Sequence, residues 1–420
     1  DVAEAMGPVE VALLKNIAEL RFRGNNDVTT LIVAPAFPIP RELESYVTVF
    51  ELPLPTDEEI RDQIQTFAKS QDYEVSETSE KTLARTLKGM TAPQILQVLR
   101  QAYQNDGYLD ENDVSFILRA KEQFVKKSGM LEFVNVSGSN LMNESIGGLN
   151  TLRGWLHNKR KILENLDKAK KARVPMPNGI LIVGMPGCGK SLTAKATASL
   201  FRLPLARLDV GRLLGKYVGE SEENMRKALR LAEAIAPCVL WVDEIEKAFA
   251  GVGGKDESGV TTRLFGQFLT WMQEKQSLVF IVATANDISG LPPEFLRKGR
   301  FDELFSVDLP DSDEREQILK IHLRNRGYLS EEFKNTIVKE LAGDTTKGFN
   351  GADLEAAVNE AIEMAFFDRP EDEQDEKVVV TSEHLRKAVK DIHSISETMG
   401  ERLDAMRAAF TKLHIRSASK

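Results

Sequence analysis

Several features that this sequence lacks narrow the class of protein. Its 420 residues include only two cysteines, which are too few for a disulfide framework and fit a reducing compartment. The five histidines show no metal-ligand spacing, and the HExxH motif of zinc proteases does not occur. No uninterrupted apolar run approaches the roughly 20 residues needed to cross a bilayer, and no signal peptide is recognisable. We therefore expect a protein of the cytoplasm or of an equivalent compartment.

Basic residues are also fewer than acidic residues. Lysine and arginine total 55 residues against 64 aspartates and glutamates, which gives a formal net charge of −9. Such a surface does not attract DNA or RNA through its overall field, and no stripe of basic and aromatic residues is present. Nucleic acid is therefore an unexpected partner. The length predicts two or three domains.

Two segments about 250 residues apart share one order of landmarks. Residues 29–64 and 279–318 each read as an apolar strand, a proline-rich turn, a second apolar strand, Leu-Pro and an acidic helix start. Convergence is the alternative, but the shared order favours duplication. We interpret residues 1–125 as a partial, degenerate copy of residues 255–395. This copy is expected to hold a strand pair and a helical lid, and its front half is absent from this sequence.

The remaining chain divides by composition. Residues 126–145 are polar and punctuated by serine, glycine and asparagine, which is typical of a linker. Apolar runs alternate with helical patterns over residues 146–310, which predicts an α/β domain with a mainly parallel sheet. Residues 311–395 are expected to form a small helical lid. Residues 396–420 are expected to form an amphipathic helix followed by a basic, frayed end.

A phosphate-binding loop is predicted at residues 184–191, which match G-x-x-x-x-G-K-S between a strand and a helix. Glycines let the backbone N–H groups face phosphates, and the helix N-terminus adds a favourable dipole. Lys190 would reach the β- and γ-phosphates, and Ser191 would hold Mg²⁺. A chance glycine-rich turn would not have strand, loop and helix in register. The residues expected to bind the nucleotide here are Pro186, Gly187, Cys188, Gly189, Lys190, Ser191 and Leu192.

An apolar run at residues 238–242 ends in two carboxylates, Asp243 and Glu244. Alone, such a run is more often a strand leaving the core. Its position about fifty residues after the phosphate loop favours a catalytic reading. Asp243 suits the surroundings of Mg²⁺, and Glu244 suits the general base that orients the attacking water.

These motifs together resemble the AAA family of ATPases over roughly residues 146–395. The resemblance implies a P-loop NTPase sheet flanked by helices with a small helical lid, the ligands ATP and Mg²⁺, and hydrolysis of ATP. It also implies that Asn286, at the end of an apolar strand, is the polar sensor that helps to place the attacking water. AAA proteins with a degenerate first unit occur in cyanobacteria and plastids, so the plastid stroma is a second expected location.

The same resemblance assigns residues around the base of the nucleotide. Ile146 and Gly147 belong to an Ile-Gly-Gly-Leu motif that would lie against the adenine. His322 would contact the nucleotide from the lid. Gly351 and Ala352 match a second lid position on the phosphate side.

The run Leu-Arg-Lys-Gly-Arg-Phe-Asp at residues 296–302 is similar to a family motif whose two arginines act on the neighbouring subunit's ATP. Here these arginines are Arg297 and Arg300, and the alternative is a solvated basic turn. A contact in trans has no meaning in a monomer. The resemblance therefore implies a homo-oligomeric ring, usually a hexamer.

Residues 216–222 resemble the family's first pore loop, in which Tyr217 and Val218 would grip an extended polypeptide. A packed turn is the alternative. A second pore loop, or a surface loop, is expected at residues 251–259. The leading functional hypothesis is a ring-forming ATPase that remodels or threads a protein substrate. The alternatives are an ATP-gated assembly switch or scaffold and, least favoured by the acidic composition, a nucleic-acid translocase.

Overall fold

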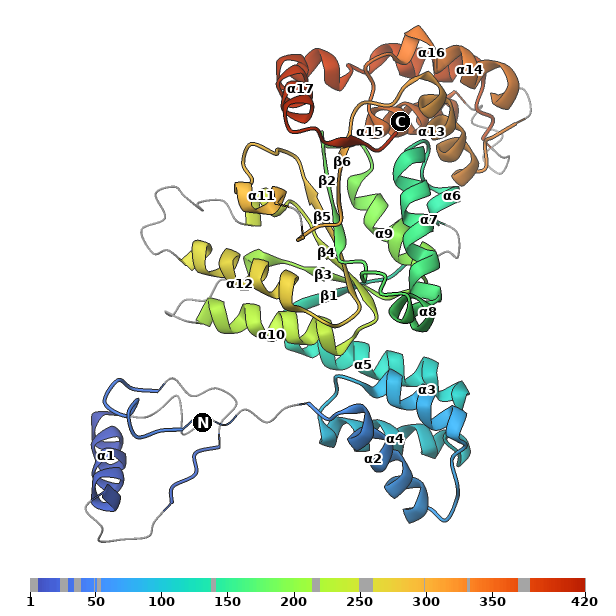
Figure 1. Ribbon diagram of the computed structural model, residues 1–420. Coiled ribbons are helices and arrows are strands. Elements are labelled where there is room, and N and C mark those ends of the chain that lie inside the picture. Colours follow the sequence, from blue (N-terminus) through green and yellow to red (C-terminus); the bar gives the residue numbers. More distant parts are fainter. Residues whose placement is uncertain are drawn as a thin grey trace. The chain divides into compact units, whose positions relative to one another are not determined.

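The chain divides into two compact units, Asp1–Leu54 and Pro55–Lys420, and each is described by itself. The elements of the computed structural model are labelled in Figure 1. The structure describes residues 7–22, 29–33, 39–48, 50, 54–136, 141–213, 220–248, 260–297, 299–330, 333–368 and 378–419.

The first unit contains helix α1 (Pro8–Phe22). The strand pair that the sequence predicts within residues 29–54 is not formed by the residues described there, so this prediction is wrong for them. Leu31 and Val33 are 83% and 96% exposed. A strand is stabilised by burial of one face, and the exposure of these two side chains is unlike that of a buried strand.

The second unit begins with a helical module, residues 57–128, in which four helices surround their own apolar core. The helices are α2 (Asp57–Ser70), α3 (Glu77–Leu87), α4 (Ala92–Asp106) and α5 (Val114–Ser128), with the short η1 (Glu111–Asp113) before α5. Helix α2 starts at a capping box in which Thr56 and Glu59 exchange hydrogen bonds. Ile60, Leu83 and Ile95 are fully buried in the module core.

A buried lysine joins two helices of the module, and a glycine lets the module approach the backbone of Ala234. Lys121 on α5 is buried, and its Nζ donates to the carbonyl oxygens of Thr86 and Lys88 at the end of α3. Burial lowers the pKa of Lys121 to about 8. Gly89 has a φ of +86°, and a Cβ there would lie 2.1 Å from the Cα of Ala234. Only glycine permits this approach of two backbones.

A seven-stranded sheet in the order β1-β3-β4-β5-β2-β6-β7 forms the centre of the second unit. Every neighbouring pair is parallel except β1 and β3, which confirms the predicted α/β class. The strands are β1 (Leu131–Val134), β2 (Gly179–Gly184), β3 (Leu205–Leu208), β4 (Cys238–Val242), β5 (Val279–Ala285), β6 (Glu303–Val307) and β7 (Arg416–Ser417).

Both edges of this sheet differ from the sequence prediction. Residues 126–145 include strand β1, with buried Leu131, and helix α6 (Leu141–Glu144), rather than only a linker. The C-terminal end is not wholly frayed, because β7 pairs with β6 and Ala418 is fully buried. Strand pairing uses backbone groups, so polar or basic side chains do not exclude it.

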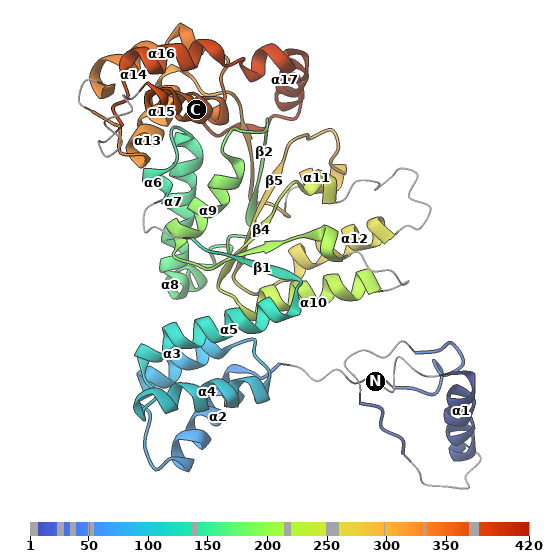
Figure 2. The same cartoon turned by 180° about the vertical axis from the view of Figure 1, so that it is seen from behind.

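Helices cover both faces of the sheet, as Figures 1 and 2 show from opposite sides. Alternate residues of β2 divide between two cores: Ile180 and Ile182 pack with α7 and α9, and Leu181 and Val183 with α10 and α12. The helices of this part are α7 (Asn150–Glu164), α8 (Leu166–Lys171), α9 (Lys190–Phe201), η2 (Val210–Leu213), α10 (Glu220–Ala234), α11 (Ile245–Ala248), α12 (Val260–Glu274) and η3 (Pro293–Leu296).

A helical lid follows the sheet, as the sequence pattern predicts. Leu319, Leu354 and Leu385 from three of its helices meet in one core. Its elements are α13 (Ser312–Asn325), the π-helix η4 (Phe333–Ile337), α14 (Val338–Leu341), η5 (Asp344–Thr346), α15 (Gly351–Phe367) and α16 (Ser382–Asp391). The C-terminal helix α17 (Ile395–Lys412) follows the lid, and its Leu403, Met406 and Phe410 pack in the core of the sheet. Of the helices in the described parts of the chain, none has the length and apolarity needed to span a bilayer.

Arg315 joins several parts of the lid from a buried position. Its guanidinium donates to the carbonyl oxygens of Pro310, Ala342 and Gly343, at 2.7–3.1 Å, and to the hydroxyl of Thr346 at 3.2 Å. The side chain is only 7% exposed. These acceptors include backbone carbonyls beyond the end of α14, which lack helical partners.

Replacement of Arg315 by methionine is expected to destabilise the lid by about 3 kcal/mol, because buried carbonyl oxygens lose their donors. Urea denaturation followed by circular dichroism measures this change. The matched control is Arg386→Met, which removes an exposed arginine of the same lid that pairs with Glu340. Equal effects of the two variants would show that the buried hydrogen bonds of Arg315 do not stabilise the lid.

Candidate nucleotide-binding site

The phosphate loop connects β2 to α9 in a shape that requires glycine. Gly187 and Gly189 have φ values of +78° and +82°, in the left-handed region that other residues rarely adopt. A Cβ on Gly187 would lie 2.4 Å from the Nδ2 of Asn350. The backbone therefore bends tightly just before α9 begins at Lys190, as an anion-binding loop requires.

Lys190 is the buried cation of this loop. Its Nζ donates to the carbonyl oxygens of Gly184 and Met185, at 2.7 Å each, and burial lowers its pKa. These partners are neutral, so the charge is left for an anion to compensate. Burial also raises the pKa of the Cys188 thiol to about 12, which keeps it neutral. Ser191 is exposed at the first turn of α9.

The two predicted carboxylates and the polar sensor meet where β4 and β5 end. The Nδ2 of Asn286 donates to the Oε1 of Glu244 over 3.0 Å. Buried Thr284 donates to the Oδ1 of Asp243 and accepts from the backbone N–H of Glu244. The structure thus brings Asp243, Glu244 and Asn286 together, since carboxyl ends of adjacent parallel strands lie at one edge of the sheet.

Each carboxylate also faces a cation that the sequence analysis missed. Arg207 on β3 lies over the ring of Trp241, and its Nη2 is 3.6 Å from the Oδ2 of Asp243. Lys247 donates to Glu244 over 2.9 Å. The pKa of Glu244 is lowered, first by this hydrogen bond from Lys247. The i,i+3 spacing of Glu244 and Lys247 was a signal for their contact. The position of Arg207 depends on the register of β3 against β4.

The lid docks onto the phosphate loop at the start of α15. The Nδ2 of Asn350 donates to the carbonyl of Pro186 over 3.0 Å, and the N–H of Ala352 donates to the carbonyl of Gly187 over 3.2 Å. Gly351, one of the predicted lid residues, lies between these two contacts. Asn350 was missed as a site residue. Its capping box with the acidic residue three positions later was the available signal.

The segment around Ile146 and Gly147 packs along α13, the helix that carries His322. The backbone N–H of Gly148 donates to the side chain of Gln317 over 3.0 Å, and that of Leu149 donates to Glu314 over 3.1 Å.

His322 is partly buried on this helix, and burial lowers the pKa of its imidazole. It lies near Arg326 and Glu355, so its immediate charged neighbours belong to the lid. The buried carboxylate of Glu314 also accepts from the N–H of Asp311, and it therefore joins the segment before α7 to the start of the lid. Its capping box with Asp311 was the available sequence signal, but that signal does not predict the contact with Leu149.

The two predicted trans-acting arginines lie at the end of η3 and shortly after it. Arg297 is exposed. Arg300 donates through Nη1 to the backbone carbonyl of Glu294, and its buried Nε has no hydrogen-bond partner within the described residues. None of these contacts joins Arg297 or Arg300 to the phosphate loop of its own chain. Tyr217, Val218 and residues 251–259 lie outside the described residues.

The oxygen donors at the loop fit Mg²⁺. Magnesium in nucleotide sites takes one or two protein oxygens, with water and phosphate oxygens as its other ligands. Ser191 offers an exposed hydroxyl at the start of α9, and Asp243 offers a carboxylate held in place by Thr284. Within the described ranges, no cluster of three or more His, Cys, Asp or Glu residues could hold a metal alone. These residues therefore suit a metal that arrives with phosphates.

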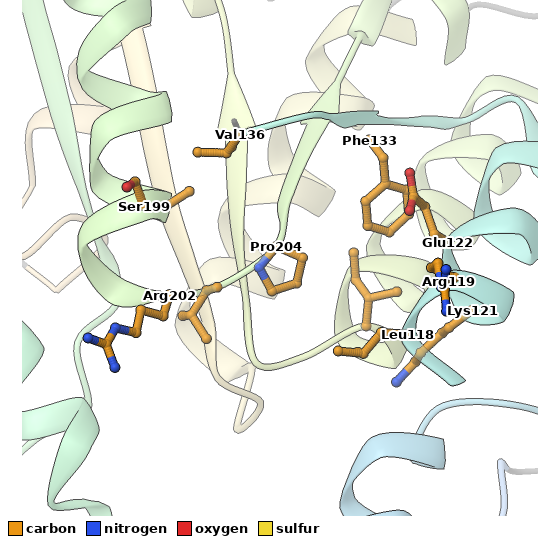
Figure 3. Close-up of a pocket in the computed structure, with 12 residues that line it drawn as sticks. Leu118, Arg119, Lys121, Glu122, Phe133, Val136, Ser199, Arg202 and Pro204 are labelled. Atoms are coloured by element: carbon orange, nitrogen blue, oxygen red, sulfur yellow. The ribbon is translucent and has the colours of Figure 1, made fainter. Parts of the chain in front are cut away.

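A separate hollow of about 550 Å³ lies between α5, β1 and the connection from α9 to β3. Figure 3 shows Leu118, Phe133 and Pro204 at its wall, with Arg119 and Arg202 also among the lining residues. None of the predicted site residues lines it.

Comparison with known proteins agrees with this geometry. Residues 180–309 match the model of the "ATPase family associated with various cellular activities (AAA)", and residues 57–128 match that of the "SpoVK-like AAA ATPase, second domain". The chain is 40% identical over 354 residues to the "Uncharacterized AAA domain-containing protein ycf46" of Guillardia theta, covering 84% of this chain and 68% of the relative. The Pyropia yezoensis protein of that name is 35% identical over 400 residues, covering 95% and 78%.

A more distant relative is the "Cell division cycle protein 48 homolog" of Archaeoglobus fulgidus. It is 32% identical over 305 residues, which cover 70% of this chain and 39% of the relative. The similarity thus extends well beyond the phosphate loop.

Proposed function

The chain belongs to the AAA family of ATPases, and from this premise we propose that it binds ATP with Mg²⁺ and hydrolyses it at the phosphate loop. The observation that carries the proposal is the hydrogen bond between Asn286 and Glu244 at the ends of β5 and β4. Strand β5 is the neighbour of β2, whose loop carries the buried cation Lys190. A carboxylate held by an amide beside a phosphate site is suited to orient a water molecule.

Each residue has a definite task in this proposal. Lys190 and the loop N–H groups bind the β- and γ-phosphates, and Ser191 and Asp243 hold the metal. Mg²⁺, when bound with ATP, offsets the charge of the phosphate oxygens. Glu244 accepts a proton from the attacking water, and Asn286 fixes the direction of the Glu244 carboxylate.

The lid closes the base side of the site in the same proposal. Ile146 and Gly147 lie against the adenine, and His322, Gly351 and Ala352 contact the nucleotide from the lid. The hydrogen bonds from Asn350 and Ala352 to the phosphate loop support a lid whose position depends on the bound nucleotide.

The proposal extends to a homo-oligomeric ring, with a hexamer as the expected form. Arg297 and Arg300 would act on the ATP of the neighbouring subunit. The exposure of Arg297 supports this assignment, because a residue that acts in trans must be reachable from outside its own chain. The proposed location remains the cytoplasm or the plastid stroma.

We assign the helical module to a degenerate first AAA unit that serves as architecture. Its four helices have their own core, and residues 57–128 match the model of the "SpoVK-like AAA ATPase, second domain". The proposed division of the whole chain is residues 1–125 for this unit, 126–145 for the connection, 146–310 for the ATPase domain, 311–395 for the lid and 396–420 for the C-terminal helix and tail.

ATP hydrolysis in the ring is proposed to thread or remodel a protein substrate past Tyr217 and Val218. Similarity to the Cell division cycle protein 48 homolog supports an ATPase of this general kind. The alternative is an ATP-gated assembly switch or scaffold, which the separate helical module favours. Threading needs an aromatic residue that grips the polypeptide, whereas the switch does not.

Replacement of Tyr217 by alanine is expected to abolish ATP-dependent unfolding of a fluorescent reporter with an unstructured tail, while ATP hydrolysis persists. Reporter fluorescence and phosphate release measure the two activities. Tyr217→Phe is the matched control and should keep both, because it retains the aromatic ring. Unfolding that survives in the alanine variant would contradict threading past Tyr217 and favour the assembly switch.

A further inference from the structure

Lys247 contacts the side chain that the proposed function makes the general base. It lies on α11, three residues after Glu244, and its Nζ donates to the Oε1 of Glu244 over 2.9 Å. The Nδ2 of Asn286 donates to the same oxygen over 3.0 Å. One carboxylate oxygen therefore has two donors, and one of these is a full positive charge.

The backbone of Glu244 is fixed, so the contact restricts what its side chain can do. Glu244 has a φ of +47°, which is rare outside glycine, and its N–H donates to Thr284. Any change in the position of the carboxylate must therefore come from side-chain torsions. Lys247 opposes that change, since moving the carboxylate separates the ion pair.

The two donors differ in what they do to a base. Asn286 is neutral and fixes the direction of the carboxylate. Lys247 adds an ion pair to the same oxygen, which holds the carboxylate against the first turn of α11. The other charged groups that act on this pair are Lys190 from the phosphate loop, Asp243 on the same turn and Glu246 on α11.

We propose that Lys247 is a positioning residue that restrains Glu244, and that hydrolysis requires its release. This inference rests on the proposed ATPase function. Lys247 is 67% exposed, so its ammonium can leave Glu244 for water without a burial cost.

Replacement of Lys247 by methionine tests this restraint. We expect kcat for ATP hydrolysis to rise about two- to fivefold. This is the change in rate that results if the free energy of an exposed ion pair no longer has to be overcome. KM for ATP should not change, because Lys247 does not touch the phosphate loop in this arrangement. Lys247→Gln should behave like the methionine variant, and Lys247→Arg should restore the wild-type rate.

Two further variants separate the restraint from a general effect of charge. Lys126→Met removes an exposed lysine that pairs with Glu122 on α5, away from the site, and should leave kcat unchanged. In a Glu244→Gln background, Lys247→Met should have no effect on the residual rate, because the carboxylate proposed as the general base has already been removed.

An unchanged or lower kcat in both neutral Lys247 variants would overturn the restraint. So would an equal increase in the Lys126 control. If the wild-type chain fails to hydrolyse ATP, the proposed function falls and the restraint falls with it. Hydrolysis by the wild type with no gain in the variants leaves the proposed function intact and removes only the restraint.

Discussion

Replacement of Glu244 by glutamine is expected to lower the rate of ATP hydrolysis by roughly 10²–10⁴-fold and to leave ATP binding intact. Glutamine has nearly the same shape and can still accept the hydrogen bond that Asn286 donates to Glu244. It cannot accept a proton from the attacking water. The two effects are measured by phosphate release and by equilibrium binding of a fluorescent ATP analogue.

Glu246→Gln is the matched control for this prediction. Glu246 is on α11, two residues after Glu244, and its carboxylate accepts from the backbone N–H of Asn286, a role that a glutamine oxygen can fill. The loss of activity should therefore be much smaller than for Glu244. Normal hydrolysis by the Glu244 variant would refute its assignment as the base, and an equal loss in both variants would leave the base unidentified between them.

Lys190→Ala is expected to differ from Glu244→Gln in ATP binding. It removes the buried cation of the phosphate loop, so ATP binding itself should be lost. If the proposed ring threads a protein, a variant that binds but does not hydrolyse ATP should keep that protein bound. Mass spectrometry of proteins retained by the Glu244→Gln variant in ATP, and absent with Lys190→Ala, would identify the substrate.

The parts of the site that the sequence predicted are those set by short-range rules. The phosphate loop needs glycines and a lysine at fixed spacing, and Gly187, Gly189 and Lys190 have the expected backbone and burial. Asp243, Glu244 and Asn286 each directly follow an apolar strand. Parallel strands end at one edge, so recognition of the strands was sufficient to bring these residues together.

Two of the residues that the sequence did not reveal act across long separations. Asn350 reaches Pro186 from 164 positions away, and Glu314 reaches Leu149 from 165 positions away. Each looks locally like a helix-capping residue, and its second contact depends on how the lid packs. Capping signals predict where a helix begins but carry no information about the neighbour that the cap will meet.

The sheet edges were missed for a different reason. Strand β7 is only two residues long, and its residues, Arg416 and Ser417, are exposed. No alternation of apolar residues can develop over such a length. The pairing is recognisable only from its backbone partners, since the N–H of Ala418 donates to the carbonyl of Ser306 and the carbonyl of Ala418 accepts from Leu152.

Replacement of Arg300 or Arg297 by alanine is expected to reduce ATP hydrolysis by about 10³-fold or more, if the arginine stabilises charge on the neighbour's phosphates. ATP binding should persist, because neither arginine contacts its own phosphate loop. Within one chain, Arg300 donates through Nη1 to the carbonyl of Glu294. A guanidinium carries five N–H donors, so this bond leaves donors for a further acceptor.

A subunit-mixing experiment distinguishes action in trans from a role within one chain. The Arg300→Ala protein keeps Glu244, and the Glu244→Gln protein keeps Arg300, so each alone is nearly inactive. In an equal mixture that assembles at random, about a quarter of the sites would pair an intact Glu244 with an intact Arg300 from the neighbour. Activity should return to about that fraction of the wild-type rate. Mixed rings without recovery would show that Arg300 belongs to a solvated turn or acts within its own subunit, and the ATP site would then be complete in one chain.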